Sequence, residues 1–348
     1  MTDIDAQIER ILIERATNAI NSGSEFELEK ELLTVVVDYS EKIIINLNAE
    51  LEELISKNHE QNLKFTENHY GKWKPALDKL EMLITTCIES GSKYNEKKKD
   101  LASEYDDVYF YVLIRLHAKA CHVSNEILYL LKGGYADGAH ARWRALHEIN
   151  VTLIFISKHG TECAERFYFH EMIDSFNMMK SVIKYEDRLQ VKGSGKEVYE
   201  DYETVYKELL IKYGKDFEQQ YGWANIYFPD IKKPGFQSLE KDVGLDHMRP
   251  YFKWASQNIH TSFKSISKNL SLPFSQGNEL MVVGPSNYGL TDPADATALS
   301  IAQATCCLLV NTTNYENVVL ASIISTLSEK IGRIFHSISN CNDFESKS

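Results

Sequence analysis

The hydrophobic positions of this chain recur with helical spacing over most of its length. Ser24 and Glu27 form a capping-box pattern, which indicates the start of a helix. The apolar run that follows has members three, four or seven residues apart, as expected for the apolar stripe of a helix: Leu28, Leu32, Val36, Ile43, Leu47, Leu51 and Leu54. Residues 59–70 are polar and predict a loop, and Pro75 predicts the start of a second helix.

The remaining sequence predicts further helices divided by glycine and proline. We expect a long helix over residues 104–132, ended by Gly133 and Gly134, followed by a helix that ends at Gly160. The other expected helices cover 161–189, 196–213, 246–269 and a final run from 293 towards 336. Only residues 279–283 are strand-like. The sequence therefore predicts an all-α multi-helix bundle with at most one short strand or hairpin.

A run of charged residues suggests how the chain is divided. Residues 96–100 read Glu-Lys-Lys-Lys-Asp and predict a solvated connector. We accordingly expect an N-terminal helical segment over residues 1–100 and a main helical domain over residues 101–348.

Composition narrows the class of protein. The chain is 43% hydrophobic and 25% charged, which is typical of a globular protein. Its net charge of −12 argues against a surface that coats nucleic acid, but it allows a local basic pocket. No stretch approaches about 20 apolar residues, and the first residues are acidic, so we expect neither a membrane span nor a signal peptide. The six cysteines include no Cys-x-x-Cys pair, so the expected protein is cytoplasmic, reduced and free of metal and cofactor.

Ionisable residues concentrate between positions 139 and 148. Arg144 and His147 are three residues apart and share a helical face, with Glu148 beside them, and Asp137 is the expected N-cap of their helix. Arg142 lies about 140° around the same helix from His147. Arg144 and Glu148 are also an ordinary four-apart ion pair, so the residues alone leave open a solvated face or a functional site.

Two flanking helices carry further candidates. On the preceding helix, Arg115 and Glu126 follow the spacing of a polar face, whereas His117 neighbours the apolar stripe and fits either a core histidine or a site residue. On the later helix, His260 shares a four-residue repeat with Ser256 and Lys264. Such a repeat is usually a solvated stripe, and a site is the alternative.

The spacing Arg142-x-x-x-x-His147 resembles the Arg-x(4–6)-His signature of the HEPN superfamily, a group of all-α nucleotide-binding proteins and metal-independent ribonucleases of toxin and anti-phage systems. The wider segment looks like a bacterial family in which an Arg-x-Arg-x-Leu-His-Glu segment follows a helix with Arg115-x-His117. The resemblance covers residues 104–170, and more weakly Ser256-x-x-x-His260. It implies a HEPN-like fold for residues 101–348 and a homodimer.

The resemblance also implies an endoribonuclease that cuts RNA, with tRNA as one candidate, through the 2′-hydroxyl and without metal. His147 would transfer the proton and Arg142 would stabilise the phosphate charge. The second histidine would come from the other subunit or from His260 of the same chain. The remaining expected roles are substrate binding by Arg144, Arg115 and His117, and orientation of the histidine by Glu148 or Glu126.

Three other classes stay open at this point. A carboxylate-bridged metal site needs Glu-x-x-His repeats on two helices, and the chain offers only Asp137-x-x-His140. A non-catalytic helical module could bind a nucleotide or another phosphorylated effector through an arginine pocket. A structural role in a defence cassette, with the basic cluster facing a partner protein or antitoxin, is the third class.

Overall fold

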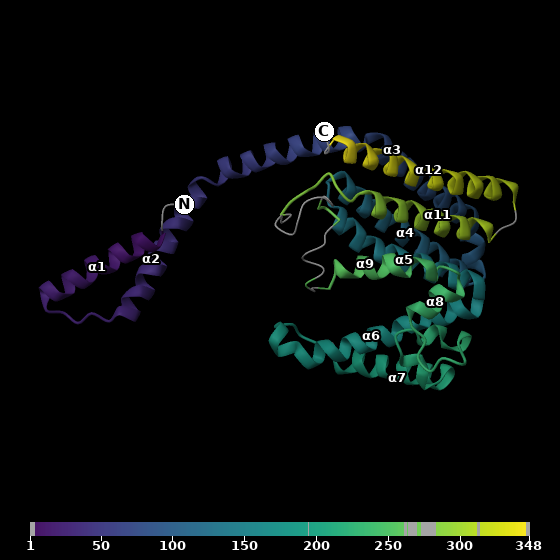
Figure 1. Cartoon of the computed structure of the whole chain (residues 1–348). Helices are drawn as coiled ribbons and strands as arrows, with labels where there is room; N and C mark the ends of the chain where they lie inside the picture. The colour runs from purple at the N-terminus through teal and green to yellow at the C-terminus, as the bar shows by residue number, and fades with distance from the viewer. Residues whose placement is uncertain are drawn as a thin grey trace. The chain divides into compact units, whose positions relative to one another are not determined.

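The protein is all-α, as predicted. The computed structural model describes residues 4–193, 195–260, 263, 270–272, 283–311 and 314–345, and these residues form helices, turns and connections without a strand (Figure 1). Residues 279–282 of the expected strand lie outside the described residues, and Val283 has no regular structure. The prediction of a multi-helix bundle is confirmed.

The chain divides into two compact units, with the division between Glu67 and Asn68. The first unit contains α1 (Ile4–Ser22), α2 (Leu28–Ala49) and the beginning of α3 (Leu51–Glu104). Helix α1 packs along α2, and Arg15 of α1 forms ion pairs with Glu31 and Asp38 of α2. Among the described residues of this unit, only Val35 is fully buried, so the unit has almost no core of its own.

In the second unit, α11 (Thr291–Val310) is the central helix. It packs against α4 (Val108–Lys132), α5 (Ala136–His159) and α12 (Tyr315–Glu345), and the four helices lie side by side in Figure 1. Its buried positions include many alanines, which allow the neighbouring helices to approach closely. By length and composition α11 could cross a membrane, contrary to the sequence analysis, but 67% of its most apolar window is buried inside the protein, as in a core helix.

The other helices cover α5 and α4. Helices α6 (Thr161–Leu189) and α7 (Lys196–Tyr213) form a pair, and 3₁₀ turns follow at Lys215–Glu218 and Gly222–Tyr227. Helices α8 (Phe236–Asp242) and α9 (Arg249–Gln257), separated by a 3₁₀ turn at Asp246–Met248, then pack on α5. The buried residues of these two short helices are apolar except for Glu240.

Helix α3 is the main departure from the sequence analysis. The polar residues 59–70 continue the helix instead of forming a loop, and Pro75 lies inside α3 rather than at its start. The charge run 96–100 is also helical, with all its residues exposed except the half-buried Lys98. The units therefore divide near residue 67, not at residue 100, and the break before α4 falls at residues 105–107, where Asp107 accepts a hydrogen bond from the Phe110 amide.

Smaller differences affect the expected site. Asp137 is not the N-cap of its helix, because its carboxylate instead accepts hydrogen bonds from the backbone amides of Leu270 (2.8 Å) and Ser271 (3.2 Å). The helix expected over 246–269 contains α9, which ends at Gln257. His260 therefore lies in the bend after α9, and Lys264 lies outside the described residues.

Candidate functional site

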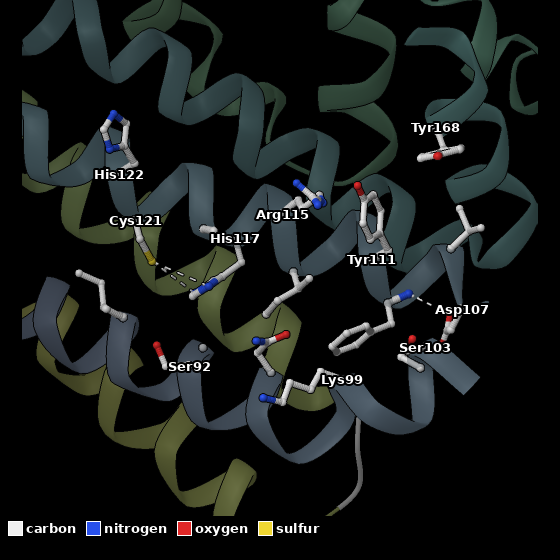
Figure 2. A pocket seen from close by; sticks show the side chains of 18 of the residues that line it. Ser92, Lys99, Ser103, Asp107, Tyr111, Arg115, His117, Cys121, His122 and Tyr168 are labelled. Atoms are coloured by element: carbon white, nitrogen blue, oxygen red, sulfur yellow. Dashed lines mark hydrogen bonds between the residues drawn. The ribbon is translucent and has the colours of Figure 1, made fainter. Parts of the chain in front are cut away.

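A cleft of about 960 Å³ opens between the second half of α3 and α4, with Tyr168 of α6 at one end (Figure 2). This volume is in the range of small-molecule sites. We call it the α4 cleft. Its polar and aromatic lining comes from three helices and the α3–α4 turn: Ser92, Asn95, Lys99, Ser103, Asp106, Asp107, Phe110, Tyr111, Arg115, His117, His122, Asn125 and Tyr168.

Arg115 and two tyrosines form the most distinctive part of the α4 cleft. The Arg115 guanidinium stacks over the Tyr111 ring at 4.1 Å, and Tyr111 meets the Tyr168 ring edge-on at 5.8 Å between centroids. Within the part of the chain that the structure describes, no carboxylate or carbonyl accepts a hydrogen bond from Arg115. Its N–H donors are therefore available to a ligand beside two aromatic rings.

The facing wall adds a second cation. Lys99 lies on α3, across the α4 cleft from Arg115 in Figure 2, and its side chain is exposed. The carboxylates of Asp106 and Asp107 lie at the end where α3 turns into α4, and Asp107 is already engaged as the N-cap of α4. The α4 cleft thus has a cationic middle and an acidic end.

His117 forms part of the floor of the α4 cleft. Its ring is buried, and Nε2 lies 3.0 Å from the Thr305 hydroxyl. The Cys121 sulfur lies 3.8 Å from Nδ1 of the same ring. Burial lowers the pKa of His117 to about 4, so the ring is neutral at pH 7. A Cβ on Gly91 would lie 2.4 Å from the ring, so only glycine leaves room for it. His117 therefore lines the cleft as a neutral, packed side chain, and its expected role in substrate binding stays a prediction.

The outer edge of the α4 cleft connects to Arg142. His122 Nε2 lies 3.2 Å from a Glu126 oxygen, and the other Glu126 oxygen accepts from Arg142. Burial raises the pKa of Glu126, but the hydrogen bond and charge of Arg142 outweigh it, and the net pKa is lowered. Glu126 thus orients a histidine, although it is His122 rather than His147.

His147 occupies a different environment. Its ring is 1% exposed and is surrounded by Trp143, Phe236 and Phe252, and Nε2 lies 3.0 Å from an oxygen of Glu240. Glu240, on α8, is fully buried and also pairs with Arg249. We call these three residues (His147, Glu240 and Arg249) the α5 network. The ring cannot touch an RNA phosphate in this conformation, so Arg142 and His147 do not meet at one phosphodiester.

The other predicted residues are likewise engaged elsewhere. Arg144 pairs with Glu148 at 3.0 Å, donates to the Ser256 hydroxyl at 3.0 Å and covers the Phe252 ring. Burial raises the pKa of Glu148, and Arg144 opposes that effect. His260 is exposed, and among the described residues no hydrogen bond or ion pair joins its side chain to Arg142 or His147.

The metal alternative has no site in the described ranges, where no group of three or more His, Cys, Asp or Glu side chains could hold a metal ion. Asp137 is committed to the backbone near Ser271, and His140 lies between the Trp143 and Trp254 rings. Neither residue of the motif belongs to such a group.

Several residues of the α4 cleft were missed by the sequence analysis. Tyr111 lies four residues before Arg115, and His122 four before Glu126, so helical spacing carried a signal for both pairs. Lys99 and Tyr168 had no such signal, because α3 and α6 bring them to the cleft from distant parts of the chain.

Comparison with known proteins adds one match. A family of unknown function, DUF5677, matches residues 109–278, just under half of the chain. The matched region contains the α4 and α6 walls of the α4 cleft and the whole α5 network, while the α3 wall and α11 lie outside it. No curated protein and no solved structure matches the chain.

Proposed function

We propose that this protein is a helical binding module whose α4 cleft holds a small anionic ligand with a flat ring, of the nucleotide class. The observation that carries the proposal is the exposed Arg115 guanidinium, unpaired among the described residues and stacked beside Tyr111 and Tyr168. The cationic groups would hold phosphate and the aromatic rings would hold the base.

The chemistry of the walls supports each half of this ligand. Arginine offers a planar fork of donors that matches phosphate oxygens, and Lys99 adds a point charge from the facing wall. Tyrosine rings stack on nucleobases with little sequence preference, each contact contributing about 1–3 kcal/mol. The hydroxyl and amide groups of Ser92, Asn95 and Ser103 are available to hydrogen-bond a sugar or base edge.

RNA cleavage through Arg142 and His147 remains a separate prediction. It requires the His147 ring to leave Glu240 and the aromatic rings around it, because a ring 1% exposed cannot exchange a proton with a bound RNA. The α4 cleft needs no such opening to admit a ligand. Binding at the cleft is therefore the function that this conformation favours.

Calorimetric titration of the full chain with nucleoside mono-, di- and triphosphates tests the proposal. We expect at least one nucleotide to bind, and Arg115→Gln and Tyr111→Ala each to weaken binding by about tenfold or more. Lys119→Gln and Tyr129→Ala are matched controls on the same helix, because both side chains are exposed and neither lines the cleft. The controls should bind as the wild type does.

Two results would overturn the proposal: the absence of binding by any nucleotide, or equal binding by the wild type, Arg115→Gln and Tyr111→Ala. A parallel assay of RNA degradation in the presence of chelator distinguishes a ribonuclease activity from the binding function proposed for the α4 cleft. Cleavage that is lost in His147→Ala but retained in Arg115→Gln would assign the activity to the α5 network instead.

A further inference from the structure

The first unit leaves an unusually apolar surface open. Across residues 4–67 the exposed large hydrophobic side chains number fourteen, against one that is fully buried. With about 100 Å² of apolar surface per side chain, half-exposure of this set leaves about 700 Å² uncovered. Monomeric proteins rarely expose a contiguous patch above about 300–600 Å², and a standard interface buries about 800 Å² per partner. The fourteen side chains together therefore expose nearly as much apolar area as one partner buries in a standard interface.

Six of these side chains follow a heptad pattern along α2 and the first turn of α3. Counted from residue 33, the positions 33, 37, 40, 44, 47, 51 and 54 alternate in steps of four and three. We call this set the α2 seam. Ser40 is its one polar member, and the other six are each about half exposed or more: Leu33, Val37, Ile44, Leu47, Leu51 and Leu54.

The α2 seam turns away from α1. The residues of α2 that meet or face α1 are Glu31, Asp38 and Tyr39, with the buried Val35 between them. At about 100° per residue, the centre of the seam lies on the opposite side of the helix. At the junction with α3, the Glu50 amide donates to the Asn46 carbonyl and the Leu54 amide to the Glu50 carbonyl, both 3.0 Å, and within this described stretch no backbone hydrogen bond joins residues 51–53 to residues 47–49. The helix is therefore interrupted at Glu50, and the four apolar seam residues before it, Leu33, Val37, Ile44 and Leu47, share the unbroken helix α2.

We propose that the α2 seam joins two copies of this chain in a parallel two-stranded coiled coil. In heptad notation, Val37, Ile44 and Leu51 occupy the a positions, and Leu33, Leu47 and Leu54 occupy the d positions. β-Branched residues at a, here Val37 and Ile44, with leucine at d favour a parallel dimer. This interface is separate from the α4 cleft and from Arg142 and His147, and it does not depend on the proposed function.

Sedimentation of the full chain and of two neighbouring variants tests the proposal. The wild type should have twice the monomer mass of 39.9 kDa. Ile44→Glu places a charge in the seam and should raise the dimer dissociation constant by about 100-fold or more. Ile45→Glu is the matched control, because Ile45 is equally exposed on the same helix but points about 100° away from Ile44. It should remain dimeric.

Orientation is tested by cysteine cross-linking. In a parallel dimer the two copies of position 40 face each other, so oxidised Ser40→Cys should form a disulfide-linked dimer, while Lys42→Cys, on the α1 side of α2, should not. The wild type controls for the native cysteines. A monomeric wild type, loss of the dimer in both glutamate variants, or a tetramer would overturn the proposal. An antiparallel pair, shown by a dimer that Ser40→Cys fails to link, would overturn it as well.

Discussion

Two groups of ionisable side chains on neighbouring helices differ in what surrounds them. In the α5 network, His147 and Arg249 each contact Glu240, and aromatic rings exclude water from the histidine. In the α4 cleft, Arg115 is exposed over Tyr111, and among the described residues no carboxylate neutralises it. The segment with the higher density of ionisable residues in the sequence thus contributes to the α5 network, which is less accessible to solvent than the α4 cleft.

This difference shows that charge density along a helix does not by itself identify a site. Charged side chains can be buried if partners satisfy them, and such networks contribute to structure and specificity. A ligand instead needs groups whose donors are still free, at a surface that it can reach. By that criterion the α4 cleft, and not the α5 network, has the properties of a binding site.

The largest expected effect comes from breaking the α5 network. Glu240→Gln removes the carboxylate that pairs with both His147 and Arg249, and it leaves Arg249 without a counter-charge in a largely buried position. We expect the free energy of unfolding to fall by about 3–5 kcal/mol, measured by urea denaturation.

Glu148→Gln provides the matched control for that variant. Glu148 pairs with Arg144 beside the network, but its side chain is about one-third exposed, so its loss should cost about 1 kcal/mol or less. Equal effects of the two substitutions would show that Glu240 does not hold the network together.

A smaller effect is expected from pH. The pKa of His117 is about 4 in the folded protein and 6.5 as its ordinary value, so the unfolded chain binds the proton first as the pH falls. The free energy of unfolding is therefore highest above pH 6.5 and decreases as the pH falls towards 4. Between pH 7 and pH 5 we expect a decrease of about 2 kcal/mol from His117. His117→Gln should therefore flatten the pH dependence of unfolding over this range.

His122→Gln is the corresponding control, because His122 lies on the same helix but is mostly exposed. Its pH dependence of unfolding should follow that of the wild type. A wild-type protein equally stable at pH 7 and pH 5 would contradict the neutral, buried state of His117. Burial also lowers the pKa of His140 to about 4, so His140 makes the free energy of unfolding decrease over the same pH range. The stability of His117→Gln should therefore still decrease between pH 7 and pH 5, but less than that of the wild type.

The smallest effect is expected at Arg142. Its partner Glu126 is more than one-third exposed, and partly exposed ion pairs contribute about 0–1 kcal/mol. Arg142→Ala should therefore change thermal stability only slightly and leave nucleotide binding at the α4 cleft within about twofold of the wild type. A loss of binding as large as that of Arg115→Gln would instead place Arg142 in the binding site through Glu126 and His122.

Local periodicity was sufficient for most of the helical architecture. The spacing of apolar residues and the glycines at 133, 134 and 160 predicted α5, α6 and α7 closely, because these signals act within one or two turns. The same approach was wrong for α3, where a polar stretch and Pro75 indicated a break. The polar stretch stays helical although it lies almost entirely before the buried part of α3, which begins at His69, and Pro75 lies inside the helix.

Sequence by itself determined the helical class, the apolar periodicity of residues 28–54 and the presence of Arg115 and His117 on one helix. Only the tertiary structure decided which charges are satisfied. Glu240 is 93 residues from His147, and Lys99 and Tyr168 reach the α4 cleft from separate helices. Partners at such separations are chosen by helix packing rather than by local spacing, and the availability of a charged group depends on those partners.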